Sequence, residues 1–217
     1  MKILKKSKSK NTKMDDMWLV SAGKDHFWMN WRFNFLIQQM KLNKIYLKKN
    51  LKIMDLGCGN GILSNQLESI FNLKIDRVDS NEDSLLLNRK VKGNLICYNV
   101  STKLRKLKNF YDVIFLFDVI EHIKKDVNFL KDTLYHLKKG GLLIINVPSI
   151  PSLFSKYDYA VGHLRRYNVK DFKIIKNKVN IKLISVNYWG FLMLPVLLLR
   201  KIMLSFYKKS NTKKLIK

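Results

Sequence analysis

The chain has 217 residues, of which 47% are apolar, and a formal net charge of +26. This length suits a single domain with a sizeable hydrophobic core. The only cysteines are Cys58 and Cys97, whose surroundings suggest neither a disulfide nor a metal site, so the reducing cytoplasm is the expected location. The basic start of the chain has no apolar segment after it, which argues against a secretion signal.

The positive charge alone does not indicate a nucleic-acid partner. Lysines supply 35 of the 42 basic residues and are scattered along the whole chain. Arginine, which forks onto phosphate and stacks on bases, is scarce. We therefore expect a lysine-rich composition rather than an RNA-binding patch, with attraction to anionic surfaces left open. Disordered basic tails are predicted at 1–24 and 208–217, around one domain at 25–207.

The first predicted element is an aromatic helix between residues 25 and 46. Trp28, Trp31 and Phe35 fall on one helical face. We expect this helix to pack over the edge of a sheet or over the mouth of a cofactor site. Arg32 is either a solvated surface cation or a partner for a cofactor carboxylate.

The segment 53–61, Ile-Met-Asp-Leu-Gly-Cys-Gly-Asn-Gly, organises the rest of the chain. An apolar run ends at Asp55, a glycine-rich turn follows, and apolar residues with helical spacing come next. This pattern predicts a strand, a tight loop and a helix. Glycines permit a sharp turn and close approach of a ligand, while the helix start offers free N–H groups.

Two classes of cofactor bind at such a corner. The dinucleotide fingerprint needs a third glycine or alanine where this chain has Ile62. Asp55 would repel a pyrophosphate and attract an ammonium group. S-adenosylmethionine, which joins an amino acid to adenosine, therefore fits better than NAD, and a dehydrogenase is disfavoured.

The next strands carry polar residues at their ends. Residues 73–79 alternate and end at Asp79, which lies 24 positions after Asp55 and can accept hydrogen bonds from a ribose. Asp79 can equally form a turn or cap the next helix. The short strand 95–98 is followed by Asn99, whose amide oxygen can accept a bond from an adenine amino group.

A buried parallel strand is predicted at 111–117, followed by Asp118 and His122. His122 is a candidate base for an acceptor hydroxyl or a structural residue at a helix start. A helix is predicted from 123 to 139, stopped by a glycine pair, with a strand at 142–148. This strand–helix alternation predicts a doubly wound, mostly parallel sheet with helices on both faces.

A loop of about 20 residues follows Pro148, and loops of that length are often functional. It contains Gly-His-Leu-Arg-Arg-Tyr at 162–167. His163 is a candidate base, and Arg165 or Arg166 could hold an acidic acceptor. The alternative is that the arginines pin the loop to the protein.

The chain ends in a predicted helix at 169–178, a sixth strand at 181–188 and an apolar helix at 191–207. The apolar run is too short to span a bilayer and contains Pro195. It is expected to be a core helix, a wall of the acceptor pocket or an interfacial helix on anionic lipid. No candidate for a seventh, antiparallel strand follows.

The segment 53–61 resembles motif I of the class I S-adenosylmethionine-dependent methyltransferases, and the segment 117–122 resembles the fourth-strand motif of the same class. Gly-His-x-Arg-Arg-Tyr at 162–167 and His-Phe-Trp-x-x-Trp-Arg at 26–32 resemble a bacterial group associated with glycan and lipid pathways. The resemblance implies a Rossmann-like fold, cofactor release as S-adenosylhomocysteine and no metal. Acids are common where this chain has Asn99. The implied cofactor contacts are Arg32, Asp55, Gly57, Cys58, Gly59, Gly61, Asp79, Ser80, Asn99, Val100, Phe117 and Asp118.

The resemblance implies methyl transfer to a small-molecule, glycan or lipid-linked acceptor, with O-methylation favoured. His122 and His163 would be catalytic, and Arg165, Arg166 and Tyr167 would bind the acceptor. Alternatives are an RNA methyltransferase and an inactive cofactor-binding or membrane-associated scaffold. The expected location is the cytoplasm, with contact at the inner face of the membrane as an option.

Overall fold

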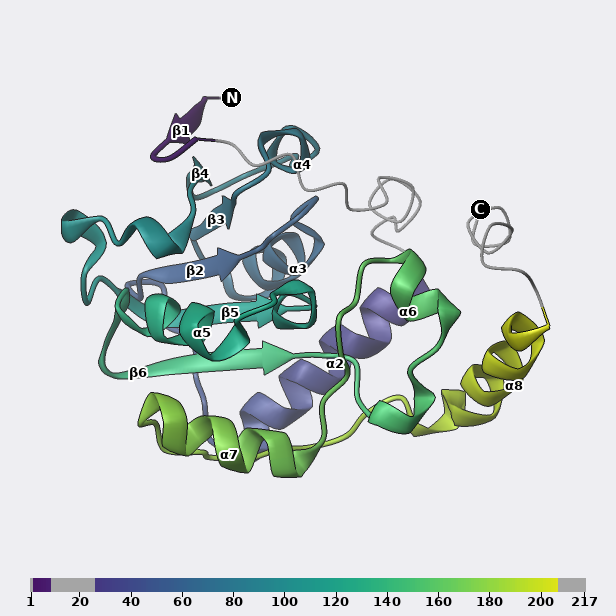
Figure 1. The fold of residues 1–217 in the computed structure, drawn as a ribbon. Coiled ribbons are helices and arrows are strands. Elements are labelled where there is room, and N and C mark those ends of the chain that lie inside the picture. Colours follow the sequence, from purple (N-terminus) through teal and green to yellow (C-terminus); the bar gives the residue numbers. More distant parts are fainter. Residues whose placement is uncertain (1, 9–25, 207–217) are drawn as a thin grey trace.

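The computed structural model describes residues 2–8 and 26–206, which form a six-stranded sheet (Figure 1). All the strand pairs are parallel, in the order β1-β4-β3-β2-β5-β6. The strands are β1 (Ile3–Lys5), β2 (Ile53–Leu56), β3 (Ile75–Asp79), β4 (Leu95–Cys97), β5 (Tyr111–Phe117) and β6 (Leu137–Asn146). The predicted doubly wound parallel sheet is confirmed.

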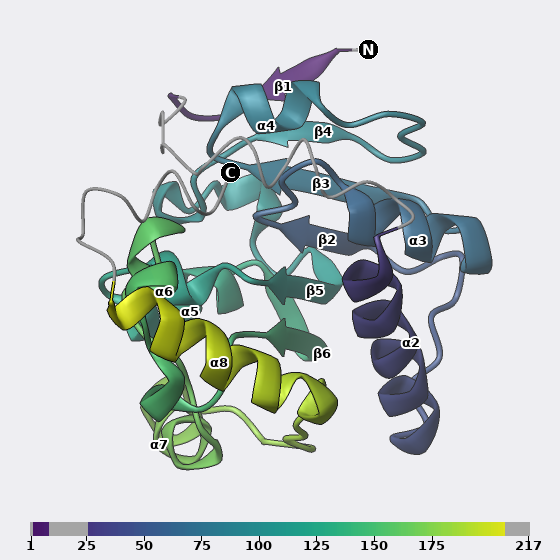
Figure 2. The same ribbon diagram turned by 90° about the vertical axis from the view of Figure 1, so that its right-hand side faces the viewer.

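Helices cover both faces of the sheet (Figure 2). On one face α2 (Phe27–Leu42) and α3 (Ile62–Phe71) pack over the side chains of alternate strand residues. On the other face lie α5 (Asp126–Leu134) and α7 (Val169–Val179). The remaining helices are α4 (Glu82–Leu86), α6 (Lys156–Ala160) and α8 (Leu194–Ser205).

The connections place the ends of β2, β3 and β5 side by side. β2 pairs with β3 on one side and with β5 on the other, so the strand order reverses at β2. Open parallel sheets bind ligands beyond the carboxyl ends of the strands at such a reversal. The predicted cofactor loop leaves β2 at this point.

The first strand corrects the prediction of a disordered tail at 1–24. Ile3–Lys5 pairs in parallel with Leu95–Cys97 at the sheet edge, and Lys5 forms an ion pair of 2.8 Å with Glu82. Ile3 and Leu4 are two adjacent apolar residues, too short a pattern to stand out in a basic segment. The rest of that predicted tail, 9–25, lies outside the described residues, as does the predicted tail at 208–217.

The boundary between α5 and β6 also differs from the prediction. The helix ends at Leu134, and Lys138 to Gly141 belong to β6 instead of capping the helix. His136 Nε2 lies 2.8 Å from the Tyr98 hydroxyl in the core, which draws the chain out of the helix early. Gly140, with φ of 74°, then accommodates an irregular stretch of β6 before regular pairing resumes at Leu142.

The predicted strand at 181–188 is wrong. These residues have no regular secondary structure and run past α2, where Asn187 donates a 2.7 Å bond to Gln39. Their apolar side chains line a cavity beside β6 instead of forming a ladder with it. Across residues 2–8 and 26–206 there is no antiparallel strand, and no described helix has the length and apolar character needed to cross a membrane.

Candidate functional site

The loop between β2 and α3 has the backbone that its glycines predict. Gly57, Gly59 and Gly61 all have positive φ, at 74°, 53° and 74°. The Gly57 N–H donates a 2.7 Å bond to the Val78 carbonyl, which ties the loop to β3. A Cβ on Gly57 would lie 2.5 Å from a methyl carbon of Val119, so a side chain is not tolerated there without movement.

A set of buried polar side chains holds this loop in place. The sequence patterns did not single them out. Arg77 on β3 is completely buried and forms a 2.7 Å ion pair with Glu68 of α3. Arg77 also bonds to Asn88, whose amide donates a 2.7 Å bond to the Gly59 carbonyl. A Cβ on Gly61 would lie 1.9 Å from Asn88 Oδ1. An arginine inside an alternating strand was the only sequence signal for this support.

The two predicted acids flank the loop. Asp55 is 2% exposed and accepts a 2.7 Å bond from the Ser64 hydroxyl. Burial raises the pKa of Asp55 to about 6 despite that bond. A cationic ligand next to this buried carboxylate would stabilise its ionised form.

Asp79 is fixed by backbone donors at the end of β3. Its carboxylate accepts bonds from the N–H groups of Gly59, at 3.2 Å, and Asn81, at 2.8 Å. Burial nevertheless raises the pKa of Asp79. Asn81, rather than Asp79, caps α4. Asp79 therefore forms the turn and also faces the loop, so both predicted roles remain compatible.

The remaining predicted cofactor residues lie at neighbouring strand ends. The Asn99 side chain accepts a 3.1 Å bond from Ser101 N–H, and its own N–H donates to the Ser7 hydroxyl. Val100 is buried in the core, and the Ser80 carbonyl lies 3.8 Å from Cys97 Sγ. Cys58 lies in the loop, where burial raises its thiol pKa well above the usual range. Cofactor contacts by these residues stay predictions.

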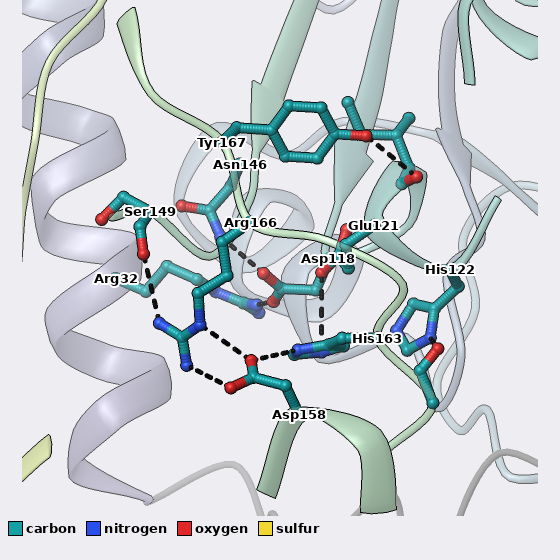
Figure 3. Close-up of polar contacts among 12 residues, drawn as sticks. Arg32, Asp118, Glu121, His122, Asn146, Ser149, Asp158, His163, Arg166 and Tyr167 are labelled. Atoms are coloured by element: carbon teal, nitrogen blue, oxygen red, sulfur yellow. Dashed lines mark hydrogen bonds and ion pairs between the residues drawn. The ribbon is translucent and has the colours of Figure 1, made fainter. Parts of the chain in front are cut away.

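A polar chain crosses the mouth of the site from α2 to β6 (Figure 3). Arg32 is buried, forms an ion pair with Asp118 and stacks over the Phe117 ring at 5.3 Å. Asp118 also accepts a 2.8 Å bond from Asn146. Asn146 in turn accepts a 2.8 Å bond from the Trp189 indole. Arg32 is thus neither a solvated cation nor free of partners, and its predicted contact with a cofactor carboxylate stays a prediction.

Glu121 and His122, in the turn after β5, lie close to His163, in the loop after α6 (Figure 3). His122 Nδ1 lies 3.0 Å from the Gly162 carbonyl, and burial together with the nearby His163 lowers the pKa of His122. His163 Nδ1 lies 2.9 Å from Asp158 Oδ1, and Nε2 lies 4.0 Å from Glu121. Both predicted catalytic histidines therefore face the same point.

Glu121 is the group at this point that the sequence patterns did not single out. It is completely buried, and neither carboxylate oxygen has a hydrogen-bond partner among the described residues. Burial and the adjacent Asp118 raise the Glu121 pKa well above its usual range. Glu121, His122 and His163 each offer a ligand atom within 4.8 Å of the others, which is a group that could hold a metal ion.

The two loop arginines pair with protein groups. Arg166 forks onto Asp158, with bonds of 2.8 and 3.1 Å, and holds the pKa of that buried acid at about 2 together with His163. Arg165 bonds to Asp126 at 3.0 Å, and the buried Tyr167 hydroxyl lies 2.9 Å from the same carboxylate. These contacts match the alternative in which the arginines hold the loop against the protein. Acceptor binding by Arg165, Arg166 and Tyr167 stays a prediction.

One large cavity joins these parts. It has a volume of about 1410 Å³ and extends from Gly57 in the cofactor loop past Glu121 and along β6 to Gly141. α2, α7 and the segment 181–190 form its other walls. The cofactor loop and the histidines thus open into a common space.

The parallel sheet and the glycine-rich loop after β2 indicate a methyltransferase, and comparison with known proteins gives the same class. Residues 29–186 match the family model described as a methyltransferase domain, so the chain belongs to that family. The expectation of a transferase that uses S-adenosylmethionine is confirmed at the level of the family.

Among curated proteins, the chain is 32% identical over 119 residues to ubiquinone biosynthesis O-methyltransferase from Rickettsia typhi, covering 53% of this chain and 48% of the relative. The protein of the same name from Rickettsia akari is 30% identical over 135 residues, covering 60% and 52%. The chain thus spans about half the length of these relatives.

Solved structures share the fold. A SAM-dependent methyltransferase from Archaeoglobus fulgidus has a TM-score of 0.53 at 16% identity, covering 86% of this chain and 91% of the other. The [4+2]-cyclase SpnF has a TM-score of 0.56 at 12% identity, covering 74% and 59%. A fold that also hosts a cyclase does not by itself define the reaction.

Proposed function

We propose that this chain transfers the methyl group of S-adenosylmethionine to an oxygen atom of a small-molecule acceptor. The observation that carries the proposal is the joint opening of the glycine loop and the Glu121, His122 and His163 group into one cavity. Family membership and relatives named O-methyltransferases support it.

The chain's own residues would bind and align the cofactor. Asp55 would attract its ammonium group, and Asp79 would accept hydrogen bonds from its ribose hydroxyls. The sulfonium of the bound cofactor supplies the reactive methyl group. The protein's share of catalysis is to hold the acceptor oxygen in line with that methyl and to exclude water.

The acceptor side favours a molecule with a large apolar part. The cavity beyond the histidines is walled mainly by apolar side chains of β6, α7 and the segment 181–190, such as Leu142, Ile144 and Phe172. A lipid-linked acceptor with a polar ring or head near Glu121 would use that length, whereas a free glycan would not. Glycan and RNA acceptors remain the alternatives that substrate screening would distinguish.

The C-terminal helix supports contact with a membrane surface, where a lipid-linked acceptor would reside. Leu192 is 80% exposed and Phe206 is 83% exposed, and several side chains of α8 between them are also exposed. Lys201 bonds to the Ser152 carbonyl and Arg200 stacks over Tyr157 at 3.8 Å, so these two cations point toward the protein. The apolar face would insert at the lipid interface.

The test is transfer of labelled methyl from S-adenosylmethionine to a catechol with a long prenyl chain, compared with the same catechol without the chain and with bulk RNA. Methylation of the prenylated catechol, and much less of the bare ring, is expected. Methylation of RNA alone would replace this proposal with the RNA alternative. Binding of cofactor without turnover on any acceptor would favour an inactive scaffold.

A further inference from the structure

Three arginines line the large cavity, and they differ in whether an acid neutralises them. They are Arg32, Arg166 and Arg200. Arg32 forms an ion pair with Asp118. Arg166 forks onto Asp158 through two hydrogen bonds. Arg200, on α8, forms no ion pair with any residue in 2–8 or 26–206, so its guanidinium charge faces the cavity without a described acidic partner.

The Arg200 side chain is held in one orientation by an aromatic ring. α8 packs against α6, and the two helices lie side by side in Figure 2. The Arg200 guanidinium carbon lies 3.8 Å from the centroid of the Tyr157 ring of α6, and the Tyr157 side chain is close enough to hydrogen-bond with it. A guanidinium stacked on a ring still presents N–H groups along its edge. Stacking therefore orients this cation without satisfying it.

One donor of Arg200 is left without a partner. Its Nε atom is buried and makes no hydrogen bond to any described residue. Burial lowers the pKa of Arg200, but a guanidinium still keeps its proton at neutral pH. The buried charge and the unused donor both carry a cost that a bound anion would offset. A carboxylate or phosphate can accept from Nε and a terminal nitrogen of the same guanidinium at once.

The wall around Arg200 is apolar. Leu194 and Leu197 precede it on the same side of α8 at helical spacing, and both line the cavity. Leu153 and Val161, on either side of α6 in sequence, line the cavity as well. A charge-assisted hydrogen bond is stronger in such surroundings than in water. A ligand with one acidic group on an apolar body would match this part of the cavity.

Arg200 also lies close to the candidate catalytic histidines. Its ring partner Tyr157 directly precedes Asp158 in α6, and Asp158 lies 2.9 Å from His163 Nδ1. The charges of Asp158 and Arg166 both act on the pKa of Arg200, which places the three side chains in one neighbourhood. A group bound by Arg200 would therefore lie in the same part of the cavity as His163.

We propose that Arg200 binds an anionic oxygen group of the acceptor, either a carboxylate or a phosphate, next to the site of methyl transfer. The loop arginines Arg165 and Arg166 were the sequence candidates for an acidic acceptor, but each already bonds to a protein acid. Arg200 has the charge, the unused donor and the position in the cavity that this role needs. Its role toward the acceptor rests on the proposed methyl transfer, whereas the binding of an anion does not.

The experiment is calorimetric titration of the full chain, saturated with S-adenosylhomocysteine, with two pairs of probes. Protocatechuate is compared with its neutral amide, and phenyl phosphate with phenol. The variants are Arg200→Gln and Arg200→Lys. The matched control is Lys201→Gln, which removes the same charge from the next residue of α8, where Lys201 bonds to the Ser152 carbonyl and does not line the cavity. Circular dichroism and S-adenosylhomocysteine affinity verify that each variant is folded.

We expect the wild type to bind one of the two anions about 10- to 100-fold more tightly than its neutral partner, and the preferred pair identifies carboxylate or phosphate as the group. Arg200→Gln should abolish this preference, Lys201→Gln should keep it, and Arg200→Lys should keep part of it because an ammonium lacks the planar fork.

Three results would overturn the proposal: no preference for either anion in the wild type, an unchanged preference in folded Arg200→Gln, or an equal loss in Lys201→Gln. The last would show general attraction to a basic chain instead of a site at Arg200. Methylation of the prenylated catechol in any of these cases would leave the proposed function standing.

Discussion

The cofactor half and the acceptor half of this molecule are built by different means. The cofactor half, residues 53–99, is a sequence of short strands and turns in which each glycine or acid acts near its own position. The acceptor half, comprising residues 118–122 and 146–206, is held together and to α2 by pairs distant in sequence, such as Asn146 with Trp189 and Asp118 with Arg32 of α2. The comparison teaches that local patterns predict a cofactor site, while long-range pairing shapes the space beside it.

The largest expected effect concerns the buried support of the cofactor half. Glu68→Gln leaves the Arg77 guanidinium, which is 0% exposed, without its counter-charge. We expect a loss of about 3–5 kcal/mol in the free energy of unfolding. Urea denaturation would measure it, and S-adenosylhomocysteine affinity should fall with it because Arg77 supports the loop through Asn88.

The control for this prediction is Asp132→Asn, which breaks the more exposed pair with Lys103. That change should cost less than about 1 kcal/mol. Equal losses in the two variants would contradict a special role for the buried pair.

The next effect has the opposite sign. Asp55 has its pKa raised from 3.8 to about 6 in the folded chain, so the unfolded state loses its proton first as pH rises. Stability therefore falls between about pH 4 and 6 and the penalty, about 3 kcal/mol, is complete above that window. Asp55→Asn should stabilise the cofactor-free chain by up to that amount at pH 8.

The gain from Asp55→Asn should be smaller at pH 5, by about 1 kcal/mol, because Asp55 is then mostly protonated in the folded chain. Cofactor affinity should fall at pH 8 even as stability rises, since the amide cannot attract an ammonium group. Unfolding curves at the two pH values would measure the gain in stability, and calorimetry would measure the loss of cofactor affinity. A destabilised variant at pH 8 would contradict the assigned burial penalty.

How much could be foreseen from the sequence depends on whether a residue acts near its own position or through another element. The strands, the glycine loop, Asp55 and Asp79 were predictable because the period of two, the turn residues and the strand-end acids are local signals. The 181–188 strand was wrong because an alternating pattern also suits an irregular segment that lines a cavity. Arg77, Glu121 and the partners of the loop arginines escaped prediction because each depends on a residue from another element.

The next prediction concerns the difference in unfolding free energy between two glycine variants, which separates backbone strain from side-chain crowding. Gly61 and Gly140 share a φ of 74°, but a Cβ meets Asn88 at 1.9 Å in the first and nothing within 4 Å in the second. Gly140→Ala should cost about 1–2 kcal/mol from strain alone. Gly61→Ala should cost about 1–3 kcal/mol more from overpacking and should weaken cofactor binding. Equal unfolding free energies would refute the packing argument.

The smallest effect belongs to the acceptor half. Trp189→Phe removes the indole N–H that bonds to Asn146 at 2.8 Å and keeps most of the aromatic packing on Trp28. The expected cost is about 1 kcal/mol in unfolding free energy. Kinetics should show a raised KM for the acceptor with unchanged S-adenosylhomocysteine affinity. A weakened cofactor affinity would show that the two halves are not separable in this way.

The most direct test of the central claim is calorimetric titration of the full chain with S-adenosylmethionine, S-adenosylhomocysteine and NAD, alongside Asp79→Ala and the control Asp83→Ala. Asp83 is exposed on the adjacent helix α4. Binding of the first two ligands but not NAD, lost in Asp79→Ala and kept in Asp83→Ala, is the predicted result. A folded chain that binds neither methyl-cycle ligand would contradict the assignment of this site.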